Sequence, residues 1–247
     1  MARQKGLDRR RFVKLYPSTA AAAGLPPCLQ AAPQGPLRRY ARVRLVDGRG
    51  AVLRAADLHV GVNYIFHYPY VTTPCFLLNL GEPARPDTLT TDTGHSYRWP
   101  GGVGPHDAIV AFSAICSHRM SYPARQVSFI NYRPGPTAFV NKEQHSARKA
   151  HIIYCCSENS VYDATDGARV LGGPAPDPLA TIRLEYDRAD DALYATGTQG
   201  AVLFERFFDK FGFHLALEYE TSDIRQQVAD ASPVVPLADY TRNRILC

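Results

Sequence analysis

Two short patches of the sequence carry residue types that bind transition metals. In the first patch, Cys116 and His118 are two residues apart at the end of an apolar run, and in the second patch Cys155 and Cys156 are adjacent. Thiolate and imidazole groups are the ligands of zinc and iron sites. A Cys and a His with this spacing can reach one metal, and the second pair can complete a mixed site. The pattern therefore indicates a metal centre built from two loops.

The two patches resemble the ligand boxes of the Rieske iron–sulfur proteins. In that family, box one reads C-x-H and box two reads C-x-x-H, so that two thiolates hold one iron of a [2Fe-2S] cluster and two imidazoles hold the other. Residues 114–123 and 153–179 are similar to the two cluster loops. Within the second loop, Gly173 and Pro174 belong to a glycine- and proline-rich segment that resembles the cover over the cluster. The resemblance extends over about residues 42–198, and it implies a [2Fe-2S] cofactor.

Box two departs from the family pattern at its last position. The motif Ser160-x-Tyr162 sets a register in which Cys155 is the thiolate and Glu158 stands where the family has its second His. A carboxylate at this position can bind iron, but it adds negative charge and lowers the potential.

A second register of box two stays open. Shifting by one residue makes Cys156 the thiolate and places Asn159 at the last ligand position. Two histidines between the boxes, His145 and His151, are further candidates for the fourth ligand. Of these, His151 is the better candidate, because it is close to Cys155 in the sequence.

Four hydroxyl residues add detail to the resemblance. Ser121 and Ser157 stand where the quinol-oxidising members of the family have a pair of disulfide-bonded cysteines, so this chain is similar to the disulfide-free branch. Ser160 and Tyr162 stand where the family places hydroxyls that hydrogen-bond the cluster sulfur and a cysteine thiolate. Such hydrogen bonds favour the reduced state and raise the potential.

The elements that must position these residues are predicted to be strands. Short apolar runs, rich in β-branched and aromatic residues and separated by turn residues, are typical of a β protein. The runs cover residues 43–46, 64–68, 75–80, 109–112, 152–154, 181–186 and 193–196. Only residues 55–58 and 201–211 indicate short helices. We therefore expect an all-β fold, which the resemblance specifies as an antiparallel sandwich with a subdomain of long cluster-binding loops.

The predicted domain organisation has three parts. Residues 1–37 form an N-terminal signal, residues 38–220 form the Rieske-like domain, and residues 221–247 form an arm that lies on this domain or on a partner. Two further cysteines have simpler expected places. Cys75 lies in an apolar run and is expected in the core, while Cys247 could be free.

The N-terminus accounts for the formal charge of +5. Residues 1–14 hold six of the 28 basic residues and one of the 23 acidic residues, which leaves 22 of each sign in the rest of the chain. A neutral body has no basic stripe for phosphates, which excludes nucleic-acid binding as the main activity. The run Asp8-Arg9-Arg10-Arg11-Phe12-Val13-Lys14 and the charge-free stretch after it, which contains Cys28, resemble a twin-arginine export signal. It implies a periplasmic location, and attachment to the inner membrane through an uncleaved N-terminus stays open.

These observations combine into one functional hypothesis and two alternatives. We expect an exported electron-transfer protein or subunit of an oxidoreductase complex, whose redox partner is a cytochrome or a larger oxidoreductase subunit and whose enzymatic activity belongs to the complex. One alternative is a cluster-free Rieske-like fold that serves as a structural or docking subunit. The other is a mononuclear zinc or iron site formed by Cys116, His118 and Cys155.

Overall fold

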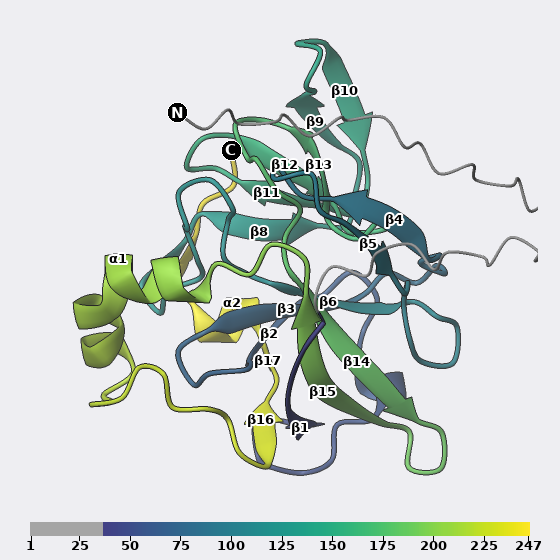
Figure 1. Cartoon of the computed structure of the whole chain (residues 1–247). Coiled ribbons are helices and arrows are strands. Elements are labelled where there is room, and N and C mark those ends of the chain that lie inside the picture. Colours follow the sequence, from purple (N-terminus) through teal and green to yellow (C-terminus); the bar gives the residue numbers. More distant parts are fainter. Residues whose placement is uncertain (1–36) are drawn as a thin grey trace, which may run out of the picture. The chain divides into compact units, whose positions relative to one another are not determined.

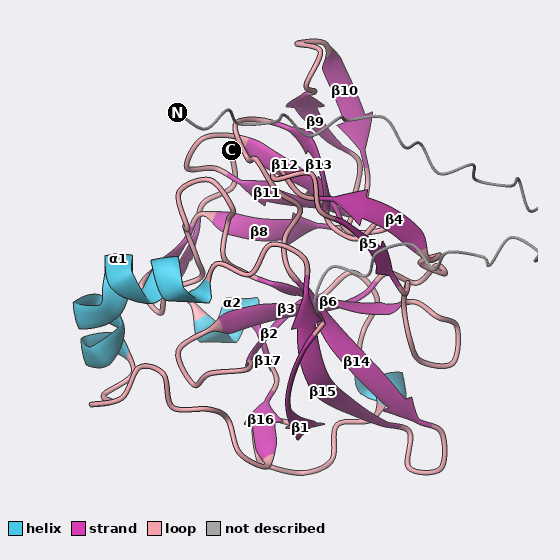
Figure 2. Cartoon of the chain, in the orientation of Figure 1, coloured by secondary structure: helices cyan, strands magenta, loops and turns pink. Residues whose placement is uncertain are grey.

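β-Strands make up most of the regular structure. The computed structural model describes residues 37–247, and residues 1–36, which contain the predicted export signal and Cys28, lie outside the described residues. Figure 2 shows strands throughout the described part, with only short helical segments between them. The predicted all-β class is confirmed.

The largest sheet has eight strands. Their order is β16-β1-β15-β14-β6-β3-β2-β17 (Figure 1). The strands are β1 (Arg38–Val46), β2 (Asn63–His67), β3 (Pro74–Asn79), β6 (Ile109–Ser113), β14 (Thr181–Asp187), β15 (Ala192–Gln199), β16 (Ala231–Pro233) and β17 (Val235–Pro236). Every residue of β6 is buried, because both faces of this central strand are covered. Such strands read as continuous apolar runs, which is why the sequence pattern reveals them.

The two edges of this sheet are bridged by one short segment. β16 pairs in parallel with β1 at one edge, and β17 pairs antiparallel with β2 at the other edge. The residue between β16 and β17 is Val234, which is buried and donates its backbone N–H to Val46 O at 2.8 Å. The sheet is therefore closed on itself, which leaves these strand edges paired rather than open to association with other chains.

A four-stranded sheet carries box two. Its order is β13-β12-β11-β8. The strands are β8 (Ile130–Arg133), β11 (Ile152–Cys155), β12 (Ser160–Asp163) and β13 (Arg169–Gly172). One hydrophobic cluster contains Phe76 and Phe112 of the large sheet together with Ile153 and Tyr162 of the small one, so the two sheets share a core.

Three smaller strand pairs complete the β structure. They are β4 (Asp87–Thr90) with β5 (Ser96–Trp99), β9 (Thr137–Val140) with β10 (Ser146–Lys149), and β7 (Val127–Ser128) with β18 (Asn243–Arg244). The first two pairs are antiparallel hairpins, while β7 and β18 run in parallel. The β9–β10 hairpin occupies much of the long segment between the two boxes and projects beyond the four-stranded sheet in Figure 1.

The helices differ from the sequence prediction in their bounds. A 3₁₀ helix, η1 (Ala55–Asp57), lies in the predicted range 55–58, whereas the range 201–211 corresponds to α1 (Phe204–Glu218). The prediction stopped before Gly212, which weakens a helix. In the structure, the buried Leu215 packs against box one and continues the helix past this glycine. A second short helix, α2 (Leu237–Tyr240), was not predicted. None of the described helices has the length and apolarity to cross a bilayer.

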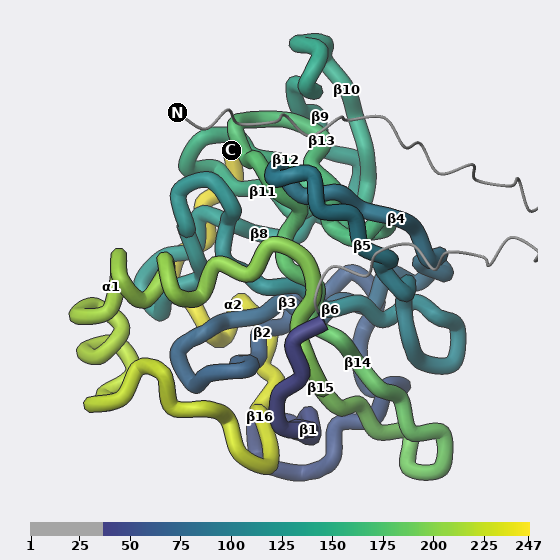
Figure 3. The backbone as a smooth tube through the Cα atoms, viewed as in Figure 1, coloured from purple at the N-terminus to yellow at the C-terminus, as the bar shows by residue number. Residues whose placement is uncertain are grey.

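The arm formed by residues 221–247 lies along the body of the protein. Figure 3 shows its yellow end running beside the strands that carry box two. The backbone N–H of Ile245 donates to Ser128 O at 2.9 Å. Beyond this contact, Cys247 forms a disulfide with Cys156, a residue 91 positions earlier in the sequence. The arm is thus covalently attached beside the turn that contains the box-two residues.

Candidate metal centre

The strand register of the β11–β12 hairpin determines which box-two residues face the core. Cys155 pairs with Ser160, and Ile153 pairs with Tyr162. Because side chains alternate across a strand, all four lie on one face, and all four are buried. Cys156 directly follows β11 and packs with the cluster on the other side of the sheet.

The two boxes meet at a pair of buried thiols. Box one follows β6 in the large sheet and provides Cys116, and box two provides Cys155. Each of these cysteines is only 1% exposed, and neither is in a disulfide. Each thiol shifts the pKa of the other, so the two side chains interact. The fold therefore brings together two predicted ligands that are 39 positions apart in the sequence.

Tyr162 connects this thiol pair to the covering loop. Its hydroxyl oxygen lies 3.2 Å from Cys116 Sγ and accepts a hydrogen bond from the backbone N–H of Ser117 at 3.1 Å. Ser117 Oγ lies 3.3 Å from the same hydroxyl and donates to Asp177 O at 2.7 Å. Since the proton of Ser117 is directed to Asp177, the single proton of Tyr162 is left for Cys116 Sγ or Ser117 Oγ. A thiolate at Cys116 is the stronger acceptor for it.

The thiols of Cys116 and Cys155 differ in acidity. The hydrogen bond from Cys155, and after it the one from Tyr162, lower the pKa of Cys116 to about 6 against the opposing effect of burial. The pKa of Cys155 is raised, first because it donates to Cys116 and then because it is buried. The ligand-free site thus favours one thiolate and one thiol. A metal would displace the second proton, because metal ligation requires the thiolate.

His118 of box one and Glu158 of box two face each other. His118 Nδ1 lies 3.5 Å from Glu158 Oε2, with the side chains 27% and 38% exposed. The other carboxylate oxygen, Glu158 Oε1, accepts a hydrogen bond from Nε of Arg119. The structure therefore places the box-two position that departs from the family pattern directly beside the histidine of box one.

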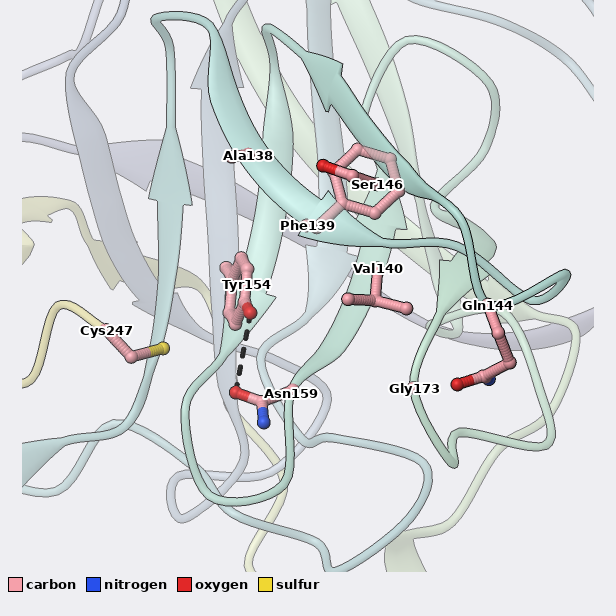
Figure 4. A pocket seen from close by; sticks show the side chains of 9 residues that line it. All are labelled: Ala138, Phe139, Val140, Gln144, Ser146, Tyr154, Asn159, Gly173 and Cys247. Carbon is pink, nitrogen blue, oxygen red and sulfur yellow. Dashed lines mark hydrogen bonds between the residues drawn. The ribbon is translucent and has the colours of Figure 1, made fainter.

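The remaining candidates for the fourth ligand lie elsewhere. Asn159 points toward Tyr154, whose hydroxyl donates to Asn159 Oδ1 at 3.4 Å. Figure 4 shows these two side chains at a separate pocket of about 490 Å³, which Cys247 and Gly173 also line. His151 accepts or donates a hydrogen bond of 2.6 Å at its Nδ1 with Tyr132 OH.

His145 and Cys156 are also separated from the thiol pair. His145 is exposed and directly precedes β10, and its backbone N–H donates to Asn141 Oδ1 at 2.8 Å. Cys156 is in the disulfide with Cys247, so it has no thiolate to offer a metal. The alternative register with Cys156 as ligand, and the expectation that Cys247 is free, therefore differ from the structure. The reason is that Cys156 follows the end of β11 and lies on the face away from Cys155.

The covering loop fits tightly against box two. Gly173 has φ +75°, and a Cβ on it would lie 2.2 Å from Asn159 O; a Cβ on Gly172 would lie 2.1 Å from Val140 O. Backbone at such short range cannot make room for a side chain. Gly173 is therefore required at this position because it has no side chain. The adjacent Pro174 is exposed.

Helix α1 supports box one from the outside. The carboxylate of Glu218 accepts hydrogen bonds from Tyr122 OH at 3.0 Å and from the backbone N–H of Arg125 at 2.7 Å. Lys210 Nζ donates to Arg119 O at 2.8 Å. No motif in the sequence indicates a role for Lys210 or Glu218, and Arg119 stands out only because it follows His118.

Two thiols, an imidazole and a carboxylate form a donor set that is compatible with a [2Fe-2S] cluster. Of the eleven buried side-chain polar atoms that have no hydrogen-bond partner among the described residues, two belong to the boxes, namely His118 Nδ1 and Ser160 Oγ. Buried polar groups are normally paired, so these atoms fit a group between the boxes that binds an imidazole nitrogen and accepts from a hydroxyl. Within residues 37–247, no group of three or more His, Cys, Asp or Glu side chains lies together as a metal site. A cluster needs only a pair of ligands for each iron.

Comparison with known proteins adds two findings. No family model matches the chain. The chain is 28% identical over 196 residues to the iodate reductase subunit IdrB of Denitromonas iodatirespirans, an alignment that covers 79% of this chain and 83% of that protein. Among solved structures, the soluble domain of the Rieske protein II (soxF) from Sulfolobus acidocaldarius shares 26% identity with a TM-score of 0.45, over 64% of this chain and 78% of that one.

Proposed function

We propose that this chain is an exported electron-transfer subunit of an oxidoreductase complex that holds a [2Fe-2S] cluster. Cys116 and Cys155 would hold one iron, and His118 and Glu158 would hold the other. The observation that carries the proposal is the buried thiol pair at the meeting point of the two boxes, together with the unpartnered Nδ1 of His118, which is two residues after Cys116 in box one. When bound, the cluster supplies one-electron oxidation and reduction.

The residues around the boxes have distinct roles in this proposal. Tyr162 donates its hydroxyl proton to the thiolate of Cys116, which stabilises the more negative, reduced state of the centre. Ser117 ties box one to the covering loop through Asp177 O, and the apolar core around Cys155 excludes water from the thiols. The site is thereby kept rigid and dry on its inner side.

The relative named iodate reductase subunit IdrB supports a role as a subunit. Its name places it in a reductase with more than one chain. By similarity, we propose a larger oxidoreductase subunit as the partner of this chain, with a cytochrome as the alternative redox partner.

The disulfide between Cys156 and Cys247 supports a location outside the cytoplasm. Disulfides form and persist in oxidising compartments such as the periplasm, while cytosolic thiols are kept reduced. This agrees with the twin-arginine pattern of residues 1–37, and we therefore propose a periplasmic protein. An uncleaved N-terminus would also attach the chain to the inner membrane.

The decisive experiment is iron and acid-labile sulfide analysis of the full chain, purified without oxygen, together with low-temperature EPR of the reduced protein. We expect iron and sulfide in equal amounts and a rhombic signal of low average g. Iron or zinc without sulfide would replace the proposal by a mononuclear site. Protein without metal would replace it by a structural or docking subunit.

A matched set of serine variants links this result to the site. Cys116→Ser and Cys155→Ser should lose both iron and sulfide. Cys75→Ser is the control, because Cys75 is equally buried but lies in β3, where its thiol donates to Tyr68 O at 3.1 Å. Retention of the cluster in Cys155→Ser would overturn the ligand assignment.

A further inference from the structure

Arg119 reaches from box one to box two. Its guanidinium Nε donates to Glu158 Oε1, while the other oxygen of that carboxylate is the one that lies 3.5 Å from His118 Nδ1. Arg119 directly follows His118 in the sequence. The loop of box one therefore provides both a ligand of the proposed centre and the cation that binds the carboxylate of box two. The two oxygens of the Glu158 carboxylate therefore have different neighbours: Oε1 is bound by Arg119, and Oε2 faces His118.

The backbone of Arg119 is fixed independently of this ion pair. Lys210 of α1 donates its Nζ to Arg119 O at 2.8 Å, and the backbone N–H of Met120 donates to Cys116 O at 2.9 Å. The guanidinium therefore extends from an anchored loop. An arginine on an anchored backbone restricts the rotation of the carboxylate it binds, because its donors are arranged in a rigid plane.

We propose that Arg119 is a positioning residue that presents Glu158 as a ligand with one free oxygen and cancels its charge. A carboxylate carries one negative charge where the neutral imidazole expected from the family pattern carries none. The guanidinium keeps its positive charge at any physiological pH, so the Arg119–Glu158 pair is neutral as a unit. This inference rests on the proposed function, because it assigns a role toward the same cluster.

An ordinary surface ion pair is the competing explanation. The side chain of Arg119 is 61% exposed, and exposed ion pairs contribute little to stability. The two explanations differ in what they affect. A surface pair would leave the retention of the cluster unchanged, whereas a positioning residue affects its retention as well as its potential, since neighbours of metal ligands tune affinity and redox potential.

The test compares Arg119→Gln and Arg119→Lys with the wild type in the full chain. We measure the rate of iron loss to a chelator, the midpoint potential by EPR-monitored titration, and thermal unfolding. Arg119→Gln should lose iron about tenfold faster, in line with the effect of removing a residue that supports a metal ligand. Its midpoint potential should fall, because the negative charge of Glu158 is no longer cancelled. Arg119→Lys should keep a midpoint potential near that of the wild type, because the positive charge is retained. It should still lose iron faster than the wild type, because an ammonium group orients the carboxylate of Glu158 less well than the planar guanidinium does.

Arg42→Gln is the matched control for loss of a positive charge. Arg42 Nε lies 2.9 Å from Glu185 Oε2, and both side chains are about half exposed, on the large sheet and outside the two boxes. This variant should leave the iron loss and the potential unchanged. An equal effect of Arg42→Gln and Arg119→Gln would overturn the inference, because it would reduce the effect to net charge.

The double variant Arg119→Gln/Glu158→His separates positioning from general stability. In the Glu158→His background, the chain has no carboxylate for Arg119 to hold, so Arg119→Gln should no longer accelerate the loss of iron. An undiminished effect in this background overturns the proposal. The proposal is also overturned if the single variant Arg119→Gln has the same midpoint potential and the same rate of iron loss as the wild type. A wild type that contains no iron and sulfide would instead refute the proposed function, and the inference with it.

Discussion

Ser121 Oγ and Ser157 Oγ lie 2.8 Å apart and share a hydrogen bond between the loop after β6 and the turn after β11. The quinol-oxidising Rieske proteins, which the two boxes resemble in sequence, have a disulfide at the matching positions. In this chain a single hydrogen bond joins the two boxes there, while the disulfide of the region lies between Cys156 and Cys247. The boxes are thus held together by packing around Cys116 and Cys155 and by noncovalent contacts, of which this serine pair is one and the Arg119–Glu158 ion pair another.

The first prediction concerns this pair of serines. The double variant Ser121→Cys/Ser157→Cys should form a disulfide under mild oxidation, because the two side-chain ends already touch. It would close a loop between positions 36 residues apart and should raise the free energy of unfolding by about 2–4 kcal/mol. Mass spectrometry of thiol-alkylated protein and denaturant unfolding measure the two effects. The single variants are controls, and free thiols in the oxidised double variant would contradict the arrangement of the loops.

The second prediction concerns the fourth ligand. Glu158→His should increase the iron and sulfide content or the retention of the cluster, and it should raise the midpoint potential, because the neutral ligand leaves the positive charge of Arg119 without its carboxylate partner. Asn159→His should change neither, since Asn159 points to Tyr154 at the separate pocket. Metal analysis and redox titration of the two variants provide the comparison. The reverse result would mean that box two uses the other register.

The third prediction concerns the disulfide of the arm. The double variant Cys156→Ser/Cys247→Ser should lower the free energy of unfolding by about 2–4 kcal/mol, because the unfolded chain regains the freedom of a long loop. A reducing agent should destabilise the wild type and have no effect on this variant. Iron and sulfide should remain in the variant, because Cys155 and not Cys156 is the proposed ligand. Loss of the cluster without loss of stability would contradict this assignment.

The fourth prediction concerns pH and His67, which lies at the end of β2. Its Nε2 is 3.2 Å from Tyr219 OH and 3.4 Å from Tyr240 OH, and burial, with a smaller effect of the positive charge of Arg125, lowers the pKa of His67 to about 4. An unfolded chain protonates this ring near pH 6.5, whereas the folded protein does so only near pH 4. The contribution to stability is therefore complete above about pH 6.5 and is lost as the pH falls toward 4.

Urea unfolding between pH 7 and pH 4.5 measures this effect. The wild type should lose at most about 3 kcal/mol over this range from His67, and less if its partial solvent access eases protonation. The variant His67→Gln should show a flatter pH dependence. Parallel curves for the two proteins would show that other groups cause the loss.

The strands and the two boxes are predictable from the sequence because they depend on local patterns. The apolar runs that became β3 and β6 are continuous because both faces of these strands are buried, and Cys116 and His118 lie directly after such a run. The contact between Cys116 and Cys155 follows from the resemblance of the boxes. The extension of α1 past Gly212 could not be predicted, because it depends on the packing of the helix against box one.

The choice among the box-two residues needed the three-dimensional register. The sequence allows Cys155 with Glu158 and also Cys156 with Asn159. The pairing of Cys155 with Ser160 places Cys155 in the core. Cys156 forms a disulfide with Cys247 of the arm, which no local sequence pattern predicts. The closure of the large sheet by residues 231–236 is equally nonlocal, since one short segment pairs with both edges.

The fit of Gly172 and Gly173 against the neighbouring backbone affects how genetic data on this protein should be interpreted. Almost any substitution at these positions would push the covering loop away from Val140 and Asn159. In a saturation-mutagenesis survey, both glycines would therefore score as intolerant as the cysteines of the site, although neither contributes an atom to its chemistry. Pro174, which is exposed beside them, should tolerate replacement far better. Intolerance to substitution in this loop is thus a measure of steric fit, and only metal content distinguishes it from ligand loss.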